Sequence, residues 1–217
     1  MSTKALIEQT IVFVKKTLQD AEGGHDWFHI ERVYKTAQTI GEAQKANMLV
    51  VLLAALLHDI ADSKFHNGDE TLGPAIARTF LEDLSVDQST TDHVVAIIEN
   101  ISFKGGKQPS KIDTLEFKVV QDADRLDAIG AIGIARCFNY GGFKNRPLYD
   151  PQIAPNLNMT KEEYKQAKAP TINHFYEKLL LLKDLMHTQK AKEMAQERHL
   201  FMESFLDQFY NEWEGKR

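Results

Sequence analysis

An apolar run followed at once by ionisable side chains is the stretch of this sequence best suited to chemistry. Residues 49–57 carry only apolar side chains, and His58, Asp59 and Asp62 follow them. Polar groups at the end of a buried helix cost free energy unless they are paired or bind a metal ion. A neutral imidazole beside a carboxylate supplies two ligands for a divalent cation. The stretch therefore predicts a metal site, or else a helix end that His58 and Asp59 only cap.

Two further stretches offer ligands of the same kind. His29 follows Asp26, a good N-cap residue, and shares one helical face with apolar residues, so its alternative role is that of a packed core histidine. A semi-apolar segment at residues 114–127 ends in three acids: Asp122, Asp124 and Asp127. Two imidazoles and two carboxylates from three helices suit a divalent metal with open positions for water and substrate.

The spacing of apolar residues predicts an all-α fold. Apolar side chains recur at helical intervals, and no stretch alternates convincingly as a strand would. Glycine and proline mark two loops, residues 102–113 and 143–158. The predicted helices cover residues 4–21, 26–46, 48–62, 70–84, 87–101, 114–127, a segment ending near 140–142, 170–187 and 189–214.

Composition narrows the class of protein. The chain has 217 residues, 43% of them hydrophobic, which is enough for one domain with a sizeable core. A net charge of −5 argues against a general nucleic-acid binder. The single cysteine, Cys137, forms no internal disulfide, and residues 49–57 are too short to span a bilayer. We expect a soluble cytoplasmic protein with a small-molecule partner and no membrane association; a homodimer is left open.

The order of these residues resembles the H…HD…D signature of the HD-superfamily metal-dependent phosphohydrolases. His29, the doublet His58-Asp59, and Asp124 match its four positions. The residues around them are similar to a branch of small single-domain bacterial HD proteins that includes nucleotide pyrophosphohydrolases. The resemblance implies that these four residues are metal ligands. It also implies one HD domain over residues 1–217, with the signature at 25–130 and a C-terminal helical extension at about 160–214.

The resemblance further implies a cofactor and a reaction. The cofactor is a divalent metal ion; the mixed ligands favour manganese (Mn²⁺), and Mg²⁺, Co²⁺, Fe²⁺ and Zn²⁺ are compatible. The reaction converts a (deoxy)nucleoside triphosphate to the monophosphate and pyrophosphate. Asp62 stands where related enzymes commonly carry a glutamate that orients or activates the attacking water. The candidate phosphate-binding residues are Lys104, Lys107, Lys64 and Lys178.

Three alternatives stay open at this point. The same metal centre would serve a nucleoside monophosphate phosphatase or a phosphodiesterase. A non-catalytic nucleotide-binding sensor is a third reading, although the intact ligand set argues against it. Among the remaining acids, we expect Asp122 on an exposed helix face and Asp127 at a ribose hydroxyl or solvent. We expect His25 to have a turn or capping role.

Overall fold

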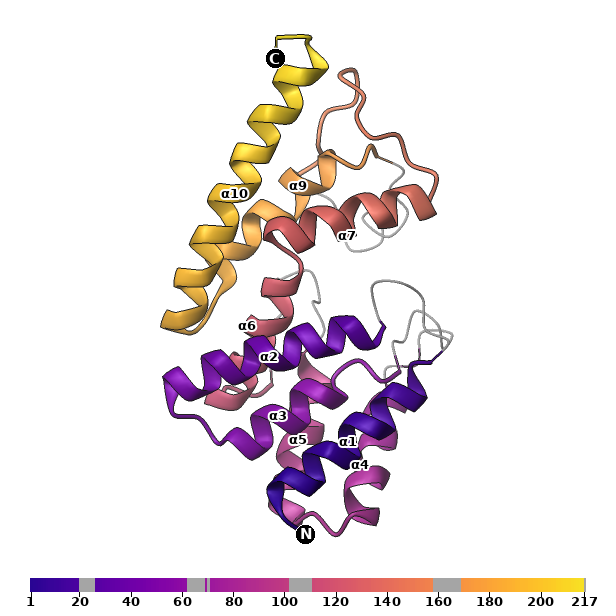
Figure 1. The fold of residues 1–217 in the computed structure, drawn as a ribbon, viewed down its shortest axis with the longest axis vertical. Coiled ribbons are helices and arrows are strands. Elements are labelled where there is room, and N and C mark those ends of the chain that lie inside the picture. Colours follow the sequence, from indigo (N-terminus) through magenta and orange to yellow (C-terminus); the bar gives the residue numbers. More distant parts are fainter. Residues whose placement is uncertain (20–25, 62–68, 70, 102–110, 158–168, 217) are drawn as a thin grey trace. The chain divides into compact units, whose positions relative to one another are not determined.

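The computed structural model describes residues 1–19, 26–61, 69, 71–101, 111–157 and 169–216. Every regular element in these ranges is helical, which confirms the all-α prediction (Figure 1). The chain divides into two compact units, Met1–Asp124 and Arg125–Arg217, and the division falls inside helix α6 (Leu115–Asp127). That residues 1–217 act as a single domain remains a prediction.

Helix α3 (Met48–Leu57) is the central element of the first unit. Seven of its ten residues are buried, as expected for a helix that is apolar on all sides. It packs against three helices of this unit, and one of these, α5, also packs against α4 (Figure 1). The other helices of the unit are α1 (Thr3–Thr17), α2 (Trp27–Gln44), α4 (Leu72–Asp83) and α5 (Gln88–Asn100).

Side-chain caps fix where the helices of this unit begin. The Asp26 carboxylate accepts a hydrogen bond from the His29 amide at 3.0 Å, which confirms the predicted start of α2. The Asn47 side-chain oxygen accepts a hydrogen bond from the Leu49 amide at 3.2 Å, and α3 begins directly after this cap. The caps matter for the site because they set the position of His29 in the first turn of α2.

Three predicted helix spans are wrong. The helix expected over residues 4–21 ends at Thr17, and residues 18–19 form a turn. The helix expected over residues 48–62 ends at Leu57, and residues 58–61 form a turn. The helix expected over residues 170–187 is instead a short α-helix, α9 (Asn173–Glu177), followed by a 3₁₀-helix, η2 (Leu179–Leu185). Lys178, between them, has φ −145°, outside the helical region, so the hydrogen-bond ladder stops there.

The second unit is built around α7 (Gly130–Phe143) and the long helix α10 (Gln189–Trp213). Helix α10 packs against both α7 and η2 (Figure 1). Stacked and edge-on phenylalanine rings lie in the core of this second unit. Among them, Phe175 and Phe205 are stacked with 5.8 Å between their ring centroids. The Thr171 amide donates a hydrogen bond to the Pro147 carbonyl oxygen at 2.9 Å. This bond connects the segment after α7 to the start of α9.

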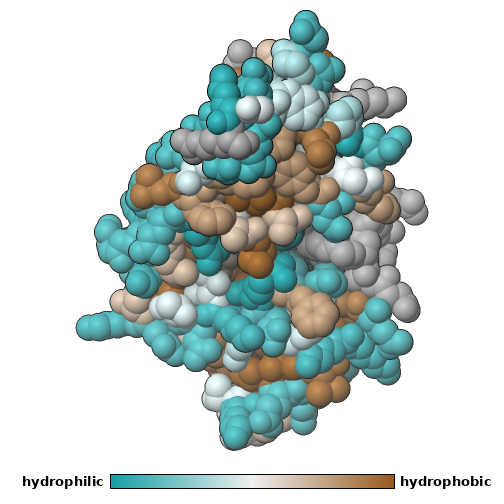
Figure 2. Space-filling model, turned by 45° about the horizontal axis from the view of Figure 1, so that its top comes forward, coloured by the Kyte–Doolittle hydropathy of each residue, from teal (hydrophilic) through white to brown (hydrophobic). Residues whose placement is uncertain are grey.

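On the face shown in Figure 2, hydrophilic residues surround several apolar patches. Among the described residues, no helix combines the length and the apolarity needed to cross a membrane.

Candidate metal site

Three side chains from three elements of the first unit meet at one point. His29 comes from the first turn of α2, His58 from the residue after α3, and Asp124 from α6. The two histidine Nε2 atoms lie 3.3 Å apart. Asp124 Oδ1 lies 3.5 Å from the His29 nitrogen and 3.8 Å from the His58 nitrogen. The second residue of the doublet, Asp59, is also close: ligand atoms of His29, His58 and Asp59 all lie within 4.8 Å of one another.

The hydrogen bond at the far side of the His58 ring fixes its tautomer. His58 Nδ1 lies 2.9 Å from the Ala55 carbonyl oxygen, one turn back in α3. A carbonyl only accepts, so Nδ1 carries a proton, and in the neutral ring Nε2 keeps its lone pair. Metal-binding histidines are commonly held this way, with the outer nitrogen donating to a carbonyl or carboxylate. The end of α3 therefore presents toward His29 and Asp124 a nitrogen that could bind a metal ion.

The spacing of these donor atoms fits a metal ion. A triangle with sides of 3.3, 3.5 and 3.8 Å has its centre about 2 Å from each corner. That is the usual distance between a divalent metal and a histidine nitrogen or carboxylate oxygen, roughly 2.0–2.2 Å. His29, His58 and Asp59 could therefore hold a metal ion, and Asp124 is placed to join them.

The other predicted site residues lie either outside the described residues or in the second unit. Asp62, Lys64, Lys104 and Lys107 lie outside the described residues, as does His25. Lys178 lies in the second unit, where its amide donates to the His174 carbonyl at 3.0 Å. Contact of these four lysines with phosphate stays a prediction.

Two expectations for the aspartates of α6 are wrong. Asp122, expected on an exposed face, is fully buried. Asp127, expected at solvent or a ribose hydroxyl, is 4% exposed and pairs with Arg136 at 2.6 Å. The burial of both follows from tertiary packing around α6, which the periodicity of one helix does not reveal.

In the second unit, the half-buried histidine His174 has a strongly shifted pKa. It lies in α9, and burial lowers its pKa to about 3, with the charges of Lys178 and Arg146 lowering it further. Burial likewise raises the pKa of the Cys137 thiol to about 12. Cys137 donates to the Thr171 carbonyl at 3.7 Å. No local pattern predicts that Arg146 influences both Cys137 and His174, because these residues are far apart in the sequence.

Comparison with known proteins agrees with the geometry. The family model of the HD domain matches residues 27–129. YpgQ of Bacillus subtilis is 40% identical over 212 residues, which cover 96% of this chain and 94% of YpgQ. The chain belongs to the HD superfamily.

Solved structures of similar proteins align over nearly the whole chain. An HD-superfamily hydrolase from Bacillus thuringiensis is 46% identical with a TM-score of 0.80, over 98% of this chain and 99% of that one. A crystal structure of B. subtilis YpgQ in complex with ADP has a TM-score of 0.74 at 35% identity, over 98% of this chain and 97% of that one.

Proposed function

We propose that this protein is a metal-dependent nucleotide pyrophosphohydrolase, which converts (deoxy)nucleoside triphosphates to monophosphates and pyrophosphate. The observation that carries the proposal is the convergence of two histidine nitrogens and an aspartate oxygen within 3.3–3.8 Å. Membership of a superfamily that includes hydrolases supports hydrolysis as the reaction. The ADP complex of YpgQ supports a nucleotide as the substrate.

In this proposal His29, His58, Asp59 and Asp124 hold the divalent ion. When bound, such an ion polarises a phosphoryl oxygen and lowers the pKa of its water toward neutrality. The Ala55 carbonyl keeps the His58 ring in the tautomer that leaves Nε2 unprotonated. The carboxylates of Asp59 and Asp124 supply negative charge that balances the cation.

The remaining steps fall to the chain's own side chains. Asp62 accepts the proton of the water that attacks the α-phosphorus. The new bond joins the water oxygen to that phosphorus, and the bond to the bridging oxygen breaks, so that pyrophosphate leaves. Negative charge grows on the leaving group, and cationic side chains are needed to balance it. Lys178, with Lys64, Lys104 and Lys107, is proposed for that role.

Product analysis in isotopically labelled water tests the proposal. Purified protein is incubated with nucleoside tri-, di- and monophosphates and a dinucleotide, each with Mn²⁺, Mg²⁺, Co²⁺, Fe²⁺ or Zn²⁺, in oxygen-18 water. We expect equal amounts of monophosphate and pyrophosphate, with the label in the monophosphate, because attack is at the α-phosphorus. Inorganic phosphate from a monophosphate would instead identify a phosphatase. Tight metal binding without any hydrolysis would identify a sensor.

Replacing the proposed base separates metal binding from turnover. We expect Asp62→Ala to keep the metal and lose roughly 10²-fold or more in kcat, since general-base catalysis contributes about 10²–10⁴-fold. Metal content and kcat are measured on the same preparation. Asp83→Ala removes an exposed carboxylate at the end of α4 and is the matched control. A wild-type kcat for Asp62→Ala would show that another group takes the proton.

A further inference from the structure

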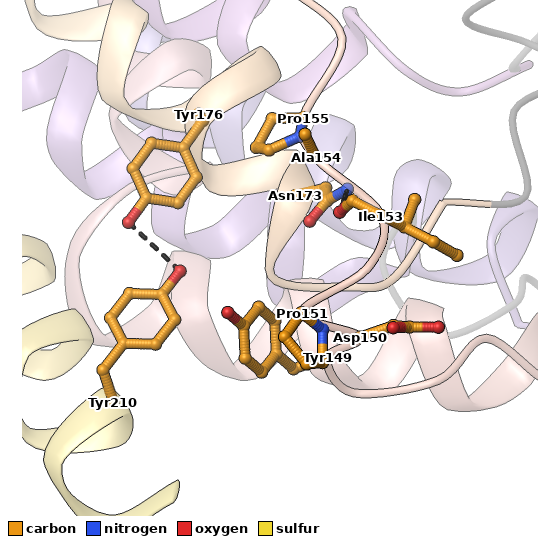
Figure 3. A pocket seen from close by; sticks show the side chains of 9 residues that line it. All are labelled: Tyr149, Asp150, Pro151, Ile153, Ala154, Pro155, Asn173, Tyr176 and Tyr210. Atoms are coloured by element: carbon orange, nitrogen blue, oxygen red, sulfur yellow. Dashed lines mark hydrogen bonds between the residues drawn. The ribbon is translucent and has the colours of Figure 1, made fainter. Parts of the chain in front are cut away.

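A pocket in the second unit lies among residues that the proposed reaction does not use. Its volume is about 320 Å³, within the range of small-molecule sites, roughly 300–1,000 Å³. Three tyrosines from three separate segments line it: Tyr149 from the segment after α7, Tyr176 from α9 and Tyr210 from α10 (Figure 3). The pocket therefore depends on tertiary packing of this unit.

Rings form two opposite sides of this pocket. Tyr176 and Pro155 lie on one side, and Tyr149 and Pro151 lie on the other (Figure 3). The hydroxyl of Tyr176 donates to that of Tyr210 at 3.2 Å, and the Tyr149 ring meets the Tyr210 ring edge-on at 5.3 Å. These contacts hold the rings in place, so a ligand would meet preformed apolar surfaces. Flat aromatic groups stack well on such surfaces.

A buried amide supplies the polar contact. Asn173 is only 1% exposed, and its Nδ2 donates to the Ile153 carbonyl at 3.0 Å. A carbonyl accepts only, so this bond fixes which end of the amide is nitrogen. The oxygen points into the space beside the tyrosines (Figure 3). It is therefore a fixed hydrogen-bond acceptor, and a ligand with an N–H group satisfies it.

The described lining of the pocket offers no positive charge that would recognise a phosphate group. Among the described residues that line the pocket, none is lysine or arginine. The one acid among these described residues, Asp150, accepts a hydrogen bond from the Gln152 amide at 2.9 Å, which closes a local turn. We propose that this pocket, none of whose lining residues is a proposed metal ligand, is a second ligand site that binds an uncharged planar heterocycle carrying an N–H donor, of the kind found in an aminopurine nucleoside.

Calorimetric titration of the wild-type protein in EDTA tests this proposal with a matched ligand pair. Adenosine carries the exocyclic amine, and purine riboside lacks it but keeps the rings and the sugar. We expect adenosine to bind without metal and to bind at least roughly tenfold more tightly, because purine riboside leaves the buried Asn173 oxygen unpaired. Equal affinities, or no heat from adenosine at millimolar concentration, would overturn the proposal.

A pocket-filling variant locates the binding. Ala154 is exposed and lines the pocket, so Ala154→Trp fills it without removing core packing. Gln152→Trp adds the same ring to the same segment outside the lining and is the control. We expect Ala154→Trp to lose adenosine binding and Gln152→Trp to keep it, with unchanged helical circular dichroism in both. Undiminished binding by Ala154→Trp would place the ligand elsewhere and sink the proposal, whatever the nucleotide products turn out to be.

Discussion

Two histidines near the starts of helices face opposite electrostatic surroundings. His29, 2% exposed in the first turn of α2, lies 3.5 Å from the Asp124 carboxylate and 3.3 Å from a second imidazole. His174, in α9, is influenced by the positive charges of Lys178 and Arg146. The same side chain is thus placed among potential ligands of a cation in one unit and among cations in the other.

The difference shows that residue type alone does not assign a role. Carboxylates beside His29 favour a positive charge at that point, which a metal ion can supply. At His174, burial and nearby cations both disfavour the imidazolium, so the ring stays neutral at ordinary pH. Metal binding is therefore expected at the first histidine and not at the second, and this contrast can be tested.

Removing a proposed metal ligand should give the largest effect. We expect His29→Ala and Asp124→Ala each to weaken metal binding by about 10²-fold or more and to abolish measurable hydrolysis, since even outer contacts of a metal site are worth about 10–100-fold. Metal content by elemental analysis and kcat/KM are the measurements. His174→Gln is the control and should bind metal as the wild type does. Full metal occupancy in His29→Ala would remove the contrast between the two histidines.

Metal addition should stabilise the fold by an amount that mass action sets. At a free Mn²⁺ concentration one hundred times Kd, the free energy of unfolding should rise by about 2.7 kcal/mol. For a chain of this size, that raises Tm by roughly 5–10 °C. Differential scanning calorimetry with and without EDTA measures the shift. Asp124→Ala should lose it and His174→Gln should keep it; equal shifts in both would place the stabilising ion elsewhere.

The smallest effect concerns acidification at His174. Its folded pKa of about 3 lies below the ordinary value of 6.5, so between these pH values the unfolded chain binds the extra proton. Stability therefore falls as pH drops through this window, by up to about 1.4 kcal/mol per pH unit from this group. Urea unfolding at pH 7, 6 and 5 should show a shallower fall for His174→Gln. Parallel curves for the two proteins would mean that the pKa of His174 is the same in the folded and unfolded states.

The sequence by itself determined the all-α class and the order of the proposed ligands. The apolar run of α3 and the Asp26 cap are local signals, because burial periodicity and capping act within a few residues. The same local signals placed His29 on a core face and put His58 and Asp59 at a helix end. These local signals also indicated that Asp122, Asp124 and Asp127 lie at the end of a helix, but they did not show which of the three could bind a metal ion.

The resemblance singled out Asp124 among these acids, and the tertiary structure shows where each of the three lies. Asp124 meets the two histidines, Asp127 pairs with Arg136, and Asp122 is buried. The break at Lys178 and the pocket beside Asn173 are further features that no local pattern predicted. The physical reason is range: helix propensity and capping depend on sequence neighbours. Pairing of charges, pKa shifts and cavities depend instead on groups that meet only when distant segments pack together.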